Sequence, residues 1–245
     1  MPERAPSTIP ADAAPKSLLS RMVGVFFSPR ATFADVAARP KWFGVLSVSV
    51  LIMVIALFAL FTTEVGQQAW IDQQVRSSES FGRTISDQQY QGMERIAPYI
   101  GYIVACAYLI ILPVIVAIIS GILLGVFNAL LGGDATFKQV FAVVSHAGVV
   151  TVLQTLFAVP LDYMRETLSS PTNLGVFVPF LDEASFLARL LGSIDVFQIW
   201  WLVTMSIGLG VLYKRRTAPI ATTIFVVYGV LALALAAIRT ALAGA

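Results

Sequence analysis

The chain has 245 residues, of which 58% are hydrophobic and only 12% are charged, with a formal net charge of +2. A soluble domain carries about 25% charged residues, so this composition excludes an ordinary soluble protein. It predicts an all-α, multi-pass integral membrane protein in contact with the lipid bilayer. The small net charge argues against a nucleic-acid partner, and the single cysteine, Cys106, excludes an intrachain disulfide.

The segment before the first long apolar run divides into two parts. Residues 1–15 are rich in proline and alanine, and we expect a disordered tail there. Residues 16–42 predict cytoplasmic amphipathic helices at the membrane interface, because 18–27 is apolar at helical spacing but too short to span a bilayer. Thr32 and Asp35 have the spacing of a capping box for a second short helix. The apolar rows of the first helix are Leu18, Met22 and Phe26, and Leu19, Val23 and Phe27.

Five apolar runs predict five transmembrane helices, since a span needs about 20 apolar residues. As one helix, the second and longest run would measure about 52 Å, against a hydrocarbon core of about 30 Å. That helix must therefore tilt, kink at Pro113 or project beyond the bilayer. The spans make up a membrane domain over residues 43–238 and are expected at 43–62, 97–131, 137–161, 194–213 and 218–238.

Two polar segments connect these spans on the side opposite the N-terminus. Ser86 and Gln89 have capping-box spacing, which predicts a helix that continues into the second span. In the later segment, Asp182 is expected to cap a short helix that ends at Gly192 and lies flat on the membrane.

The second span carries a row of small residues, Ala117, Gly121, Gly125 and Ala129, at a spacing of four. Such a row lets a second helix approach closely in a membrane. It predicts either a homodimer face or, as we favour, packing against another helix of the same chain. Gly132 and Gly133 follow, and they are expected to end the helix.

Three neutral polar residues are expected within the membrane: Asn128, His146 and Gln154. For His146 we favour a hydrogen bond across helices, with a proton relay as the alternative. The adjacent Ser145 would point about 100° away from it on a helix, which argues against a serine nucleophile. The sequence also has no Walker loop and no metal-binding pair of histidines, so we predict no catalytic, cofactor or metal residue and a non-enzymatic protein.

Lys and Arg are in excess on the side of the membrane that holds the N-terminus, which predicts that this side is cytoplasmic. The same residues, together with the apolar rows, suggest docking on anionic lipid. Plain positive-inside anchoring explains the charges equally well. The candidate docking residues are Arg21, Phe26, Phe27, Arg30, Lys41 and Trp42.

Three stretches together resemble the Yip-type (Ypt-interacting protein) domain family over roughly residues 18–238. They are FFSPRATFADVAARPKWFGVL, GGDATFKQVFAVVSHAG and SIDVFQIWWLVTMSIGLG. The resemblance implies a helical membrane domain with a cytoplasmic N-terminus. Eukaryotic members are implicated in trafficking and in binding Rab-type GTPases, but this chain lacks their Tyr-Gly-x-Pro type of motif. Its alanine- and arginine-rich composition is closer to bacterial members, which are inner-membrane proteins.

These observations lead to a membrane-organising or scaffold protein that acts through lipid, through a second copy of itself or through other membrane proteins. The alternative is a small-solute permease or channel. The spans hold no Asp, Glu, Lys or Arg at mid-depth, whereas a transporter usually carries an ionisable residue there. A break at Pro113 is the feature that would fit the alternative.

Overall fold

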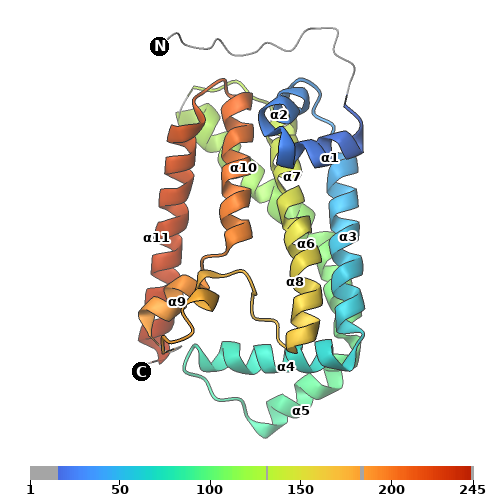
Figure 1. Ribbon diagram of the computed structural model, residues 1–245, viewed down its shortest axis with the longest axis vertical. Coiled ribbons are helices and arrows are strands. Elements are labelled where there is room, and N and C mark those ends of the chain that lie inside the picture. Colours follow the sequence, from blue (N-terminus) through green and yellow to red (C-terminus); the bar gives the residue numbers. More distant parts are fainter. Residues whose placement is uncertain (1–15, 131, 183–184, 244–245) are drawn as a thin grey trace.

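The computed structural model describes residues 16–130, 132–182 and 185–243, and the expected disordered tail at 1–15 lies outside them. In this part of the chain every regular element is helical, and Asn173 and Asp195 form an isolated β-bridge. Long helices stand side by side, and short helices lie across both ends of the bundle (Figure 1). The all-α integral membrane fold expected from the composition is confirmed.

The long helices form the membrane domain. Among the described residues, four helical stretches are long and apolar enough to cross a membrane. The apolar α10 has 17 residues and measures about 26 Å, close to the hydrocarbon core of about 30 Å. The predicted five segments are therefore formed by α3 (Phe43–Phe61), α6 (Ile100–Leu124), α7 (Phe137–Ala147) with α8 (Val149–Arg165), α10 (Val196–Leu212) and α11 (Thr217–Ala243).

The short helices are divided between the two ends of the bundle (Figure 1). At one end, α1 (Leu18–Phe27) and α2 (Pro29–Ala38) lie near the turn that joins α10 to α11. This division is the one that successive crossings of the membrane predict. The opposite end carries α4 (Glu64–Glu79), α5 (Asp87–Ile96), α9 (Phe186–Gly192) and the 3-10 turns Ala97–Tyr99 and Leu174–Phe177.

The long second span is accommodated by tilting. Ser86 and Gln89 form the predicted capping box at the start of α5, and one helical stretch then runs from Asp87 to Ala129. Pro113 lies inside α6 without ending it. Figure 1 shows α6 crossing diagonally behind the other long helices, from the base of α3 toward the far end of α10 and α11. A tilted helix fits more residues into the same bilayer thickness.

The third span, expected at 137–161, is a helical stretch from Phe137 to Arg165 with one turn residue, Gly148, between α7 and α8. One expected helix start is wrong, because Asp182 does not cap α9. Ser185 does, since its hydroxyl accepts a hydrogen bond from the N–H of Ala188. Ser185 directly precedes the apolar stripe of α9, so it occupies the N-cap position that Asp182 misses by one turn.

Non-helical backbone leads into α10, which begins beside the middle of α8 (Figure 1). Asp195 is the N-cap, and its Oδ1 accepts from the N–H of Phe197 at 2.8 Å. Its Oδ2 accepts from the hydroxyls of Ser170 and Thr172, each at 2.6 Å. Irregular backbone at membrane depth requires polar groups that are satisfied within the protein, and this cluster provides them.

The interior of the bundle is centred on α7, in which every residue from Val140 to Ala147 is buried. One side of α7 packs against α3 and α6, and the other packs against α2 and α10. Phe33 and Val36 of α2 are completely buried among the side chains of α7 and α10, so α2 belongs to the core of the fold.

Candidate functional site: the N-terminal helix pair and a lateral cavity

Helix α1 has one face on the bundle and one face in the open. Its buried residues are Arg21, Gly24 and Val25. Gly24 lies so close to α2 that a Cβ atom added there would be 2.3 Å from Thr32 Oγ1. The opposite face is an exposed apolar stripe: Leu19 is 71% exposed, Val23 46% and Phe27 85%. The helix therefore has an exposed apolar face, and its inward face includes an arginine.

Helix α2 starts earlier than the capping-box spacing suggests. Ser28 precedes it without a side-chain cap, and Pro29 occupies the first turn, where a proline lacks only an N–H that the helix does not use. Thr32 and Asp35 lie inside the helix and are buried, so the predicted capping box is wrong. Lys16 Nζ donates to Thr32 Oγ1 at 3.1 Å, which accounts for that buried hydroxyl.

A buried ion pair fastens α1 to α2. Arg21 Nε lies 2.8 Å from Asp35 Oδ2, and both side chains are at most 4% exposed. Arg39 Nη2 approaches the other oxygen of the same carboxylate at 3.3 Å from a partly exposed position. Arg21 also donates from Nη1 to the backbone carbonyl of Arg39 at 3.1 Å. Arg21 is thus a structural residue, and its predicted role in lipid docking is wrong.

The other candidate docking residues separate into two groups. Phe26 packs edge to face on Trp200 with ring centroids 5.4 Å apart, and Trp42 packs in the same way on Phe141 at 4.9 Å. Both rings are half-buried against another aromatic ring, and their predicted part in docking stays a prediction. Phe27, Arg30 and Lys41 are exposed as predicted. We call these three residues, together with Leu19 and Val23, the docking surface.

His146 is completely buried in α7 and bonds within its own helix. Its Nδ1 lies 2.7 Å from the carbonyl oxygen of Ala142, and because a carbonyl only accepts, Nδ1 carries the proton. The expected hydrogen bond across helices is therefore wrong. In the described part of the chain Nε2 is buried without a hydrogen-bond partner. Ser145 likewise donates to its own helix, to the carbonyl of Phe141 at 2.7 Å.

Asn128 has a structural role at the end of the second span. Its Nδ2 donates to the carbonyl of Ala135 at 2.7 Å, and its Oδ1 accepts from the hydroxyl of Tyr213 at 3.0 Å. These bonds hold the turn before α7 against the end of α10. Gln154, the third of these polar residues, is half-buried in α8.

The small residues of α6 do not pack as a row within the chain. A Cβ added at Gly121 or Gly125 would meet nothing within 4 Å, and Ala129 is exposed. The buried residues Val116 and Ser120 lie about 100° around the helix from the row. Ala117 is partly buried against the core, so the favoured interpretation of packing within the chain is wrong for Gly121, Gly125 and Ala129 only. The homodimer alternative stays a prediction.

The two glycines after α6 have separate uses. Gly132 has a φ of +67°, the left-handed conformation that ends the helix. A Cβ at Gly133 would lie 2.5 Å from the Tyr213 ring, so this position requires a residue without a side chain.

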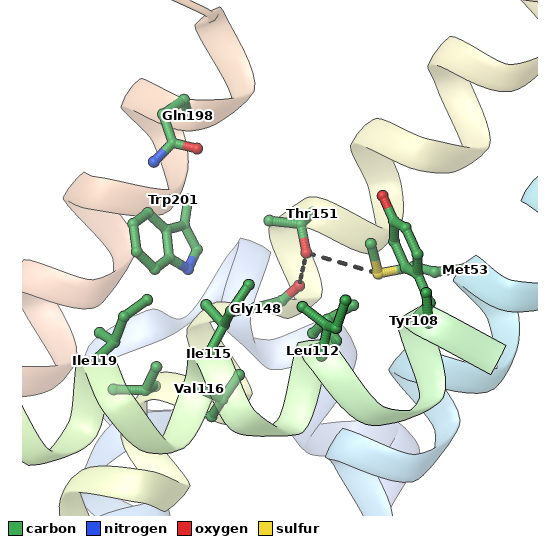
Figure 2. A pocket seen from close by; sticks show the side chains of 13 residues that line it. Met53, Tyr108, Leu112, Ile115, Val116, Ile119, Gly148, Thr151, Gln198 and Trp201 are labelled. Carbon is green, nitrogen blue, oxygen red and sulfur yellow. Dashed lines mark hydrogen bonds between the residues drawn. The ribbon is translucent and has the colours of Figure 1, made fainter. Parts of the chain in front are cut away.

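A lateral cavity of about 570 Å³ opens between α3, α6, α8 and α10. Figure 2 shows Gln198 and Trp201 of α10 facing the aliphatic side chains of α6 across it. The few polar groups include Thr151, whose hydroxyl already donates to the carbonyl of Gly148 at 2.7 Å. An apolar cavity of this kind suits a hydrocarbon chain better than a polar solute. Its α6 wall includes Leu112, Ile115, Val116 and Ile119.

Sequence reasoning missed this cavity. The lining residues on α6 lie on both sides of Pro113, but a proline in a long apolar run does not say which helix it faces. Gln198 is recognisable as a neutral polar residue of the fourth span, yet its position beside α6 depends on the tilt of that helix.

The sequence model of the Yip1 domain matches residues 23–238. The match takes in α2, all five transmembrane segments and the helices at both ends of the bundle. No curated protein and no solved structure matches the chain.

Proposed function

The chain belongs to the Yip1 domain family, and from this premise we propose that it is a non-enzymatic membrane-organising protein whose N-terminal helix pair docks on an anionic bilayer surface. The observation that carries the proposal is the stripe of Leu19, Val23 and Phe27, exposed on a helix that a buried ion pair holds in place. A rigidly held apolar stripe at the end of a membrane bundle inserts into the interface without losing conformational entropy on docking.

Charge at the same end supports the choice of lipid. Arg30 of α2 and Lys41, which follows that helix, are exposed, as are Lys138 at the start of α7 and Lys214 in the turn between α10 and α11. Each basic residue near an anionic membrane surface contributes about 1 kcal/mol of attraction. The excess of basic residues also supports a cytoplasmic N-terminus, and the composition supports a bacterial cytoplasmic membrane as the location.

Docking is measured on the full-length protein in vesicles with and without phosphatidylglycerol, in a background with Cys106→Ala. Spin labels are placed at Leu19→Cys and Phe27→Cys, and Gln88→Cys, exposed on α5 at the opposite end of the bundle, is the water-facing control. We expect the first two labels to be reached mainly by oxygen, which partitions into lipid, and the third by a water-soluble nickel reagent. Equal access of the nickel reagent to all three labels would leave the N-terminus as a charge anchor only.

Membrane organisation is tested by reconstituting the protein into giant vesicles of the anionic composition and following their shape with protein density. The double variant Leu19→Asp/Phe27→Asp should insert normally but lose the effect, while Gln88→Asp, on the exposed surface of α5, keeps it. The competing permease function predicts that the wild-type protein carries small polar solutes into liposomes. Such a flux, with no effect of the double variant on vesicle shape, would reverse the proposal.

A further inference from the structure

A second cavity, of about 810 Å³, lies between α6, α10 and α11. It adjoins the lateral cavity at three shared lining residues, Ile119, Gln198 and Trp201. Its origin is the tilt of α6. That helix approaches α10 closely at one end, where the rings of Phe127 and Tyr213 stack 4.8 Å apart, and diverges from α10 and α11 toward the other (Figure 1). We call this second cavity the groove.

The groove is long, and its lining is mostly apolar. Along α11 its lining extends from Pro219 to Leu231, which is about 18 Å of helix. One leaflet of a hydrocarbon core of about 30 Å has a depth of about 15 Å, so the groove matches one leaflet. The other walls are formed by Ile122 and Leu123 of α6, by Val126 just beyond its end, and by Leu202 and Met205 of α10.

One end of the groove is basic. Arg215 and Arg216 line it there, both are exposed, and they directly precede Thr217, where α11 begins. The N-terminus of a helix adds its own positive potential. No acidic residue of the described chain lines the groove. A molecule that is anionic at one end and hydrocarbon over the rest complements this arrangement.

The charge pattern of the groove selects its occupant. The groove is apolar over the depth of one leaflet and basic at one end, and an acyl chain that carries an anionic phosphate matches both features. We propose that the groove binds one acyl chain of an anionic phospholipid, with the phosphate at Arg215 and Arg216. This site is separate from the docking surface and does not depend on the proposed function.

The test uses the full-length protein in nanodiscs that contain phosphatidylglycerol with a photoreactive diazirine on one acyl chain. Illumination should attach the lipid to peptides covering 119–127 and 219–231. Arg215→Gln/Arg216→Gln should weaken binding about thirtyfold, the equivalent of about 2 kcal/mol. Val227→Phe should block the groove, because Val227 lines it. Val226→Phe is the matched control: Val226 is 59% exposed and Val227 54%, but Val226 does not line the groove.

Each result decides the proposal. Loss of attachment in Val227→Phe but not in Val226→Phe, with unchanged melting temperatures, supports it. Equal attachment in all variants, or labelling spread evenly over every lipid-facing helix, overturns it. Competition by glycerol phosphate as strong as that by phosphatidylglycerol would also overturn it, because the site would then bind the anion without the chain. The variant Leu19→Asp/Phe27→Asp should leave attachment unchanged, which separates this site from the docking surface.

Discussion

The ion pair between Arg21 and Asp35 should be among the most sensitive points of the fold. Asp35→Asn keeps the volume of the side chain but removes the negative charge that faces two guanidinium groups, at 2.8 and 3.3 Å. Arg21 is only 3% exposed, so its charge would be left buried and unpaired. Removing one partner of a buried pair costs about 3–5 kcal/mol. We expect a loss of about 3 kcal/mol for this isosteric change.

Two further variants isolate the cause. Arg39→Gln removes the outer arginine, whose side chain is 34% exposed, and should cost about 1 kcal/mol or less because water screens that pair. Arg21→Met/Asp35→Leu replaces the buried pair by apolar side chains and should restore most of the stability that Asp35→Asn loses.

Stability is measured by titrating the purified protein from mild detergent into sodium dodecyl sulfate and following tryptophan fluorescence. Trp42 and Trp200 pack against this region and report on its loosening. The reasoning fails if Arg39→Gln costs as much as Asp35→Asn. It also fails if the apolar double variant is as unstable as the single one, since the effect would then not come from an unpaired buried charge.

Two other predictions concern the membrane domain. In a Cys106→Ala background, Gln88→Cys, exposed on α5, should react with an impermeant maleimide in intact cells, and Ser20→Cys should not; the reverse pattern would invert the topology. Gly121→Leu and Gly125→Leu should change the detergent melting temperature little, because both positions face open space. Gly208→Ala should lower the melting temperature strongly, since a Cβ there would lie 2.6 Å from Val143 and 2.9 Å from the Phe33 ring. Equal effects at all three glycines would contradict the packing described.

Apolar runs and local capping signals could be interpreted from the sequence because each depends on neighbours within a few residues. The five spans, the capping box at Ser86 and the left-handed Gly132 belong to this class. The face that a helix presents to its own protein depends on its tilt and rotation instead. The row at Gly121 and Gly125 has the spacing of a packing face, but the tilt of α6 turns it outward.

Charged residues near a membrane were the least predictable part of the candidate site. Arg21 fits the pattern of an interfacial basic residue, and nothing in its own helix marks it as buried. Arg21 pairs with Asp35 of α2. Helix α2 in turn packs against α7 and α10, which lie far along the chain. The distinction between a docking arginine and a structural one is therefore a tertiary property. The contact of Phe26 with Trp200 is tertiary in the same sense, because Trp200 lies on α10.

The burial of α2 has a consequence for how the protein is made. Val36 and Leu209 meet in one cluster, yet they are about 170 residues apart, and at 5–20 residues per second the ribosome needs roughly 9–35 s to synthesise that interval. During this time α2 has a hydrophobic face and no core to receive it. The stripe on α1 can meanwhile keep the nascent N-terminus on the membrane surface, beside the place where α7 and α10 will arrive. The proposed docking by α1 would thus serve the assembly of the protein as well as its finished form.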